Sequence, residues 1–157
     1  MIIHVVLGFL DIIKVLNNYK EKNMLITRAS EYAILSLILL CSSDEPMDSE
    51  TLSRELSIPK SFLAKILQSL AKKGILKSYK GAKGGFALDK MPQEISMLDV
   101  MTSVEGKAPA VFECAPSEDN CPSKRANICS IWPFLHKLQG KIDSFLGELT
   151  LADIIEE

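Results

Sequence analysis

Residues 49–90 constrain the fold of this chain most strongly, because two short helical patterns flank a proline there. Asp48 or Ser49 can cap the first pattern, in which two leucines one helical turn apart face inward. A residue that precedes proline is disfavoured in the helical conformation, so this helix is expected to stop before Pro59.

The second pattern predicts a helix that Ser61 caps and that ends at Gly74, since glycine commonly closes a helix. Its apolar positions recur at three- and four-residue spacing: Leu63, Ile66, Leu67 and Leu70. Two short helices joined by a tight turn are typical of a helix-turn-helix unit.

The segment after Gly74 predicts a β-hairpin. Residues 75–80 and 86–90 alternate in polarity on either side of the glycine-rich turn 81–85. A hairpin that directly follows a helix-turn-helix unit is expected to be a wing. The alternative is an ordinary surface hairpin.

Further helices are expected on both sides of this unit. Apolar spacing predicts one from Thr27 to Cys41 and another from Ser96 to Gly106. Residues 107–130 lack periodicity, and irregular segments of this length are uncommon unless they are functional or disordered. A long amphipathic helix is then expected from Ile131 to about Leu149.

This last helix carries a coiled-coil-like seam at alternating four- and three-residue steps: Ile131, Leu135, Leu138, Ile142, Phe145 and Leu149. We expect it to form a dimer, and the alternative is packing within its own subunit. The fold class is therefore mainly α with a small β-hairpin wing: a winged helix-turn-helix domain (24–106), a three-cysteine loop (107–130), and a dimerisation helix with a C-terminal tail (131–157).

Residues 1–23 are interpreted as an N-terminal extension, with an additional amphipathic packing helix as the alternative. Residues 2–16 are apolar but contain His4, Asp11 and Lys14, and they lack the basic start and cleavage site of a signal peptide. The stretch is also short and charged for a membrane span. The chain is therefore expected to be cytoplasmic, with no membrane partner.

Charge is distributed very unevenly along the chain. Its net charge is -2, yet residues 59–90 hold eight lysines against Asp89 alone. Such a basic block on an otherwise acidic protein indicates one surface that faces a polyanion. Solvated helices usually mix charges of both signs, and residues 56–93 contain no glutamate. The expected partner is double-stranded DNA.

The outward positions of the second short helix are the expected reading surface, because the start of a recognition helix enters the major groove. Gln68 can pair with adenine, and Ala64 can contact a thymine methyl group. The candidate DNA contacts are Arg28, Lys60, Ser61, Ala64, Lys65, Gln68, Lys72, Lys80 and Lys83.

Three cysteines fall in the irregular segment, with six residues between Cys114 and Cys121 and seven between Cys121 and Cys129. Clustered cysteines in a reducing compartment favour metal or redox chemistry over disulfides. Zinc sites usually use closer pairs, whereas this wide spacing suits an iron–sulfur cluster, whose ligands are thiolates. Thiol sensing and zinc binding are the alternatives, and Cys41 is interpreted as a core cysteine.

An enzyme is not expected. The sequence shows no nucleophile elbow, no dinucleotide-binding loop and no general base, and its two histidines, His4 and His136, are isolated.

The chain from about Met24 to Ile155 resembles the IscR/NsrR-type (Rrf-type) winged-helix regulators. The resemblance is carried by LITRASEYAILSLILL at 25–40, by the helix-turn-helix and hairpin residues 56–90, by the three cysteines, and by residues 131–154. GAKGGF at 81–86 and TLADI at 150–154 are its most specific motifs. It implies a homodimeric repressor that binds an imperfect palindrome and senses iron–sulfur status, nitric oxide or redox state.

The resemblance also implies a ligand set. The nitric-oxide-sensing branch completes a four-iron cluster with a carboxylate from the partner's first helix, and Glu31 occupies that place. The IscR branch uses a histidine where this chain has Trp132, with His136 one turn further on. A four-iron cluster on Cys114, Cys121, Cys129 and Glu31 is therefore favoured over a two-iron cluster. The alternative for Glu31 is a surface carboxylate at a helix N-terminus.

Overall fold

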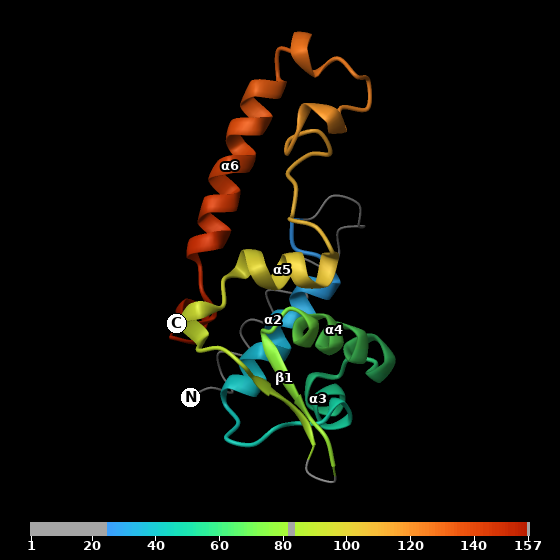
Figure 1. Cartoon of the computed structure of the whole chain (residues 1–157), viewed down its shortest axis with the longest axis vertical. Coiled ribbons are helices and arrows are strands. Elements are labelled where there is room, and N and C mark those ends of the chain that lie inside the picture. Colours follow the sequence, from blue (N-terminus) through green and yellow to red (C-terminus); the bar gives the residue numbers. More distant parts are fainter. Residues whose placement is uncertain (1–24, 82–83, 157) are drawn as a thin grey trace.

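The computed structural model describes residues 25–81 and 84–156, and the expectations for residues 1–23 and Lys83 fall outside this part. The elements in chain order are α2 (Arg28–Cys41), α3 (Ser49–Leu56), α4 (Lys60–Lys72), β1 (Leu76–Tyr79), β2 (Gly85–Leu88), η1 (Pro92–Glu94), α5 (Met97–Glu105), η2 (Glu118–Asn120), η3 (Ala126–Ile128), α6 (Trp132–Glu148) and α7 (Leu151–Ile155). Helices α2 to α5 and the hairpin form one unit, from which α6 and the loop before it project (Figure 1).

Helix α2 begins and ends where its sequence predicts. The Thr27 side chain accepts a hydrogen bond from the backbone N–H of Ser30, at 3.2 Å, and so caps the helix start. One stripe of α2 is buried, with Ala33 and Leu37 completely inaccessible to solvent. The helix ends at Cys41, as expected.

The turn between α3 and α4 depends on backbone conformation. Asp48 caps α3 by accepting hydrogen bonds from the backbone N–H groups of Glu50 and Thr51. The helix ends because Ser57 adopts a left-handed conformation, with φ of 56°. Ile58, directly after this turn, is buried and fixes the corner against the core.

The prediction that Ser61 caps α4 is wrong, because the helix begins one residue earlier at Lys60. Pro59 takes the capping position with φ of -55°, close to the helical value, and its carbonyl accepts the N–H groups of Phe62 and Leu63. The predicted core stripe is confirmed, since all four of its side chains are buried. Gly74 follows α4 with φ of +71°.

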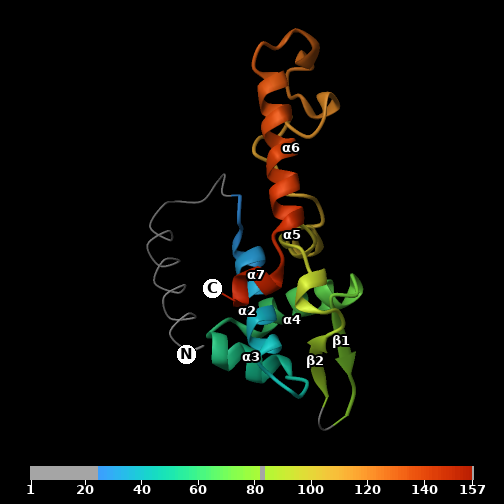
Figure 2. The ribbon, with the colours of Figure 1, turned by 90° about the vertical axis from the view of Figure 1, so that its left-hand side faces the viewer.

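The predicted hairpin is present as a two-stranded antiparallel sheet in which Leu76 pairs with Leu88 and Tyr79 with Gly85. Strand β2 also pairs with the segment before α3, through hydrogen bonds in both directions between Met47 and Phe86. A side chain at Gly85 would lie 2.4 Å from the Met47 backbone, so this close approach requires glycine. The hairpin is thereby held next to α3 and stands as a wing beside the helix-turn-helix unit (Figure 2).

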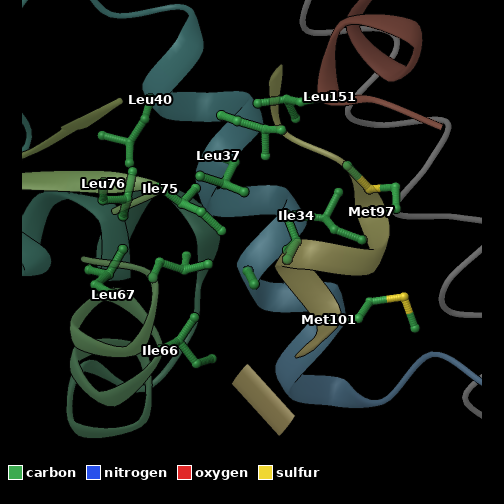
Figure 3. Packing of buried hydrophobic residues seen from close by; sticks show 14 of the residues in the cluster. Ile34, Leu37, Leu40, Ile66, Leu67, Ile75, Leu76, Met97, Met101 and Leu151 are labelled. Carbon is green, nitrogen blue, oxygen red and sulfur yellow. The ribbon is translucent and has the colours of Figure 1, made fainter. Parts of the chain in front are cut away.

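A single apolar core joins these elements. Figure 3 shows the buried side chains of α2, α4 and α5 meeting in the interior, with Ile75 and Leu76 from the start of the hairpin. Helix α5 is capped by Ser96 and ends at Gly106, as its sequence predicts. No helix in the described residues is long and apolar enough to cross a membrane.

The C-terminal segment is not an unstructured tail. Thr150 and Asp153 form a capping box that starts α7, and Leu151 is completely buried in the core. Backbone hydrogen bonds join Met97 to Leu149 and Leu151 to Ile95, so the chain end pairs with the start of α5. The sequence did contain a signal for this helix, because Thr-x-x-Asp before apolar residues is a capping-box pattern.

The predicted seam of α6 meets different neighbours along the length of the helix. Ile142 and Leu149 pack against the main core, and Leu135 packs against the cysteines. Ile131 and Phe145 are exposed, at 56% and 62%. The seam residues lie on one side of α6, and part of that side packs within its own subunit. The dimer that this helix is expected to form stays a prediction.

Candidate DNA-binding surface and cysteine loop

The outward face of α4 presents the predicted reading side chains. Lys60, Ser61, Lys65, Gln68 and Lys72 are exposed, and Ala64 is half-buried. The buried stripe on the opposite side of α4 fixes which side chains point outward, because residues one or two positions from a buried residue lie on another face of the helix. These exposed positions form one continuous face from the first to the last turn of α4.

Two of the predicted DNA-contacting cations are already paired with carboxylates. Lys60 Nζ lies 2.9 Å from Glu50 Oε2, and this hydrogen bond and the charge of Glu50 raise the pKa of Lys60. Arg28 Nη1 lies 3.2 Å from Glu31 Oε2. The Lys60–Glu50 pair is exposed, and such pairs contribute little to stability, whereas the Glu31 side chain of the other pair is only 13% exposed. A phosphate can therefore compete with Glu50 for Lys60.

The wing extends the basic surface away from α4. Lys77, Ser78, Tyr79 and Lys80 are exposed at the end of β1. The Lys77 ammonium lies 5.6 Å from the centre of the Tyr79 ring, within range of a cation–π interaction. Lys80 follows at the turn, in a position that can reach a phosphate backbone.

Sequence reasoning missed an aromatic pair beside this surface. Phe62, on the first turn of α4, is 40% exposed, and its ring meets Tyr32 of α2 edge-on with centroids 5.8 Å apart. The helical pattern placed Phe62 on neither the core stripe nor the outward face, so only the tertiary contact with α2 identifies it. An exposed apolar ring beside the reading face is available for contact with DNA.

The loop between α5 and α6 contains the three predicted cysteine ligands, all with free thiols. Cys114 and Cys121 are 7% and 9% exposed and share a small buried cluster with Ala126, against which Trp132 and Leu135 of α6 pack. Cys129 is half-buried. The segment is less irregular than expected, since η2 and η3 lie within it.

The Cys121 thiol lies in a local nest of hydrogen-bond donors. The Ser123 hydroxyl, at 3.4 Å, and the backbone N–H groups of Arg125, Ser123 and Lys124 hold the pKa of the Cys121 thiol below its usual range. Lys124 adopts φ of +52°, which turns this backbone around the sulfur. Such a setting favours a thiolate, the form of cysteine that ligates metals.

The thiols fit an iron–sulfur cluster by their chemistry, although the described residues do not gather three histidine, cysteine or acidic side chains around one point. Glu31, the predicted fourth ligand, has a side chain that is 13% exposed and pairs with Arg28 of its own helix. Cys41 is half-buried at the end of α2, where burial raises the pKa of its thiol.

Side chains of α6 hold the first part of this loop. The Trp132 indole N–H donates to the Cys114 carbonyl at 3.0 Å, and His136 Nδ1 lies 2.9 Å from the Ala115 carbonyl oxygen. One turn further on, the Gln139 amide binds Val111 and Pro109 of the loop. The start of the loop is fixed as well. Thr27 and Ser30 at the start of α2 donate hydrogen bonds to Glu105, the last residue of α5.

Residues 26–157 match the Rrf2 family, which is described as iron-dependent transcriptional regulators. The chain belongs to the Rrf2 family. The match covers the winged unit, the cysteine loop, α6 and α7, so the resemblance found in the sequence is confirmed. This Rrf2 protein is a helix-turn-helix transcriptional regulator that binds DNA, and it is not an enzyme.

Three relatives show how similar this Rrf2 chain is to other transcriptional regulators. An HTH-type transcriptional regulator of Lactococcus lactis is 31% identical over 82% of this chain and 83% of its own length. One from Aquifex aeolicus is 29% identical over 84% and 92%. The regulator IscR of Yersinia pseudotuberculosis is 28% identical over 84% and 79%.

Solved structures confirm the fold of this Rrf2 chain. A transcriptional regulator from Listeria innocua is similar with a TM-score of 0.69, at 22% identity, over 88% of this chain and 90% of its own. CymR, the global cysteine regulator of B. subtilis, gives 0.64 at 23% identity over 83% and 95%. T. potens IscR gives 0.61 at 22% identity over 83% and 85%.

Proposed function

We propose that this chain is a dimeric, cytoplasmic repressor that binds an imperfect DNA palindrome and is switched by an iron–sulfur cluster on Cys114, Cys121 and Cys129. The observation that carries the proposal is the loop itself. Cys114 and Cys121 share one buried cluster, and Cys121 is surrounded by hydrogen-bond donors that favour its thiolate form. The iron-dependent character of the Rrf2 family supports the same chemistry.

The DNA partner follows from the winged unit and its charge. The exposed lysines of α4 and the wing would neutralise phosphates, while Ala64 and Gln68 would contact base edges in the major groove. Two copies of α4 in a symmetric dimer would read two half-sites about 10 base pairs apart. An imperfect palindrome has this arrangement.

The dimer would form through the exposed apolar side of α6. Phe134 and Phe145 are 61% and 62% exposed, and Ile131 lies along the same side of the helix. Exposed aromatic side chains in a row indicate a protein interface. A partner helix packed here would remove them from water.

Glu31 of the partner subunit is the proposed fourth ligand of a four-iron cluster. Its carboxylate lies on the first turn of α2, and α2 is joined to the base of the loop through Glu105. To ligate, Glu31 would have to exchange its ion pair with Arg28. Arg28 would then be released for a phosphate, which would couple the loop to DNA contact.

A cluster, when bound, would supply iron and sulfide that react with oxidants or nitric oxide. The chain's own part would be to hold three thiolates, to exclude water at Cys114 and Cys121, and to transmit the loop position to α2 and α6. These are local ligation events that bias a two-state dimer.

The proposal is tested by purifying the full chain without oxygen and measuring iron, sulfide and visible absorbance. We expect coloured protein, and we expect colourless protein when Cys114, Cys121 and Cys129 are replaced together by serine. Binding to DNA selected by the full chain from a random library should then differ between the coloured and colourless forms. Anaerobically reconstituted wild-type protein that never takes up iron would contradict the proposal.

A cluster-free thiol switch is a second candidate. Cys114 and Cys121 lie in the same buried cluster, so an oxidant could convert their two thiols to a disulfide. This candidate predicts colourless wild-type protein whose DNA affinity changes with peroxide and recovers with a thiol reductant. Zinc bound without sulfide would indicate the remaining alternative.

A further inference from the structure

One side of α6 carries three side chains that contact the backbone of the cysteine loop. Trp132, His136 and Gln139 are spaced by four and three residues, which places them on the same face of a helix. Each of them binds a main-chain group between Pro109 and Ala115. The face is distinct from the one that exposes Phe134 and Phe145.

The contact at Cys114 involves a stacked pair of rings. Trp132 and His136 lie nearly parallel, at 14°, with their centres 4.9 Å apart. The Trp132 indole N–H can only donate, and it binds the Cys114 carbonyl. The Ala115 carbonyl can only accept, so His136 must carry its hydrogen on Nδ1 to bind it. The two rings therefore donate hydrogen bonds to the carbonyl groups of consecutive residues, Cys114 and Ala115.

Gln139 holds the loop three and five residues before Cys114 and uses both ends of its amide. Its Oε1 accepts the Val111 N–H at 2.9 Å, while its Nε2 donates to the Pro109 carbonyl at 2.8 Å and to Asp143 Oδ1 at 2.8 Å. The side chain is only 3% exposed. A buried amide with every strong partner in place is costly to disturb, because each lost bond leaves a buried polar group unpaired.

The second part of the loop is held differently. In the described part of the chain, no side-chain hydrogen bond joins residues 116–131 to another element. Their side-chain bonds are local, between Ser117 and Asp119 and between Cys121 and Ser123. The loop thus consists of residues 109–115, which side-chain hydrogen bonds fasten to α6, and residues 116–131, which contact α6 through the packing of Cys121 and Ala126 against Trp132 and Leu135.

We propose that Trp132, His136 and Gln139 are positioning residues that fasten Cys114 to α6 in the cluster-free protein, so that ligand uptake rearranges only residues 116–131. The fastening of Cys114 is argued from the hydrogen bonds alone, and the rearrangement of residues 116–131 rests on the proposed function.

Cysteine-specific alkylation of the full-length, reduced, cluster-free chain tests the fastening. Iodoacetamide modification is followed at each cysteine by mass spectrometry under anaerobic conditions. We expect Trp132→Phe to raise the rate at Cys114 by about tenfold, the effect of roughly one lost hydrogen bond on local opening. Gln139→Leu removes three hydrogen bonds and should raise the rate at least as much. The rate at Cys41, which lies in α2, should stay unchanged.

Matched variants distinguish the loss of the loop contacts from a general destabilisation of the chain. Lys141→Leu, at an exposed position on the same helix, should leave all four rates unchanged. His136→Phe keeps a ring against Trp132 but removes the Nδ1 donor, and it should act like Gln139→Leu. The single tryptophan adds a second readout, since acrylamide should quench its fluorescence more strongly in Gln139→Leu and His136→Phe.

The proposal is overturned if Cys114 reacts at the wild-type rate in all three loop-facing variants. It is equally overturned if Cys114, Cys121 and Cys129 all accelerate together, because the loop would then open as one unit. The assay needs no iron, so its outcome is independent of whether the wild-type chain takes up a cluster. If the wild-type chain takes up no iron, the proposed function is contradicted. The alkylation rates still test whether Trp132, His136 and Gln139 fasten Cys114 to α6.

Discussion

At the scale of single residues, the basic surface contains cations of two kinds. Lys60 and Arg28 have carboxylate partners, Glu50 and Glu31, in the same winged unit. Binding a phosphate at either cation requires a carboxylate to be displaced. Lys72 and Lys80 have no such partner among the described ion pairs, so a phosphate contact there would displace only counterions.

We expect Lys72→Ala and Lys80→Ala each to lower the slope of log affinity against log salt by about one, with similar effects on all DNA sequences. Lys60→Ala should change the slope less, because Glu50 already neutralises part of its charge. The measurement is a salt titration of binding to library-selected DNA. Lys137→Ala, on α6, is the control, and unchanged slopes at Lys72 and Lys80 would remove these side chains from the interface.

Gln68 is expected to affect the choice of sequence instead of the salt dependence. Its exposed amide on the outward face of α4 can make two hydrogen bonds to adenine. Gln68→Ala should reduce discrimination at one base pair in each half-site by about 1–3 kcal/mol. Selection from a random library with both proteins would reveal it, and identical preferred sequences would contradict this role.

At the scale of elements, four helix starts follow local capping signals, whereas α4 and α6 begin without a side-chain cap. Thr27, Asp48, Ser96 and Thr150 each accept a backbone N–H in the first turn of the helix that follows. The first three were expected from sequence, because the capping residue precedes a clear apolar stripe. Helix α7 was not, since five residues are too few to show a period, and only its capping box marked it.

The α7 cap should make a measurable contribution to stability. Thr150→Ala is expected to lower the free energy of unfolding by about 1 kcal/mol, because it removes the capping hydroxyl. The Thr150 hydroxyl and backbone N–H also hold the pKa of the Asp153 carboxyl below its usual range. That contribution is present above the ordinary carboxyl pKa and is lost as the pH falls through the lowered value.

Urea unfolding at neutral and acidic pH measures both effects. Asp153→Asn should destabilise the chain at neutral pH and reduce the loss of stability on acidification. An Asp153→Asn protein with the same pH dependence as the wild type would show that other carboxyl groups control the acid response.

At the scale of the whole molecule, α6 divides its surface between two tasks. One face binds the cysteine loop and the core through Leu135, Gln139 and Leu146, while another exposes Phe134 and Phe145. The exposed face is where the proposed partner subunit would pack. Because α6 contacts both α5 and the loop, a change at the cysteines would alter the angle between the two DNA-binding units of the proposed dimer.

A charge in the exposed apolar face should separate the dimer. We expect Phe145→Glu to give a monomer in sedimentation and to abolish binding to a palindrome, because a carboxylate would be buried without a partner. Ser144→Glu adds the same charge at the neighbouring exposed position on a different side of the helix and should leave assembly intact. Phe145→Glu protein that remains dimeric would place the interface elsewhere.

The sequence alone determined the order of the helices, the hairpin, the buried stripe of α4 and the lysine-rich segment. These depend on caps, apolar periods and charges that act within one or two turns of the chain. It also identified the three cysteines as a candidate ligand set, because their residue type and spacing are visible without a fold. The assignments of individual DNA contacts and of the cluster remain predictions.

Only the tertiary structure decided how these parts meet. The bond from Trp132 reaches 18 residues back to Cys114, that from Gln139 reaches 30 residues back to Pro109, and Thr27 binds Glu105 across 78 residues. No local pattern encodes such partners, since they depend on where the packed core places two distant backbones. The same applies to α6, whose apolar period is visible in the sequence, whereas only the positions of the core and the loop show that Leu135, Ile142 and Leu149 pack within the chain.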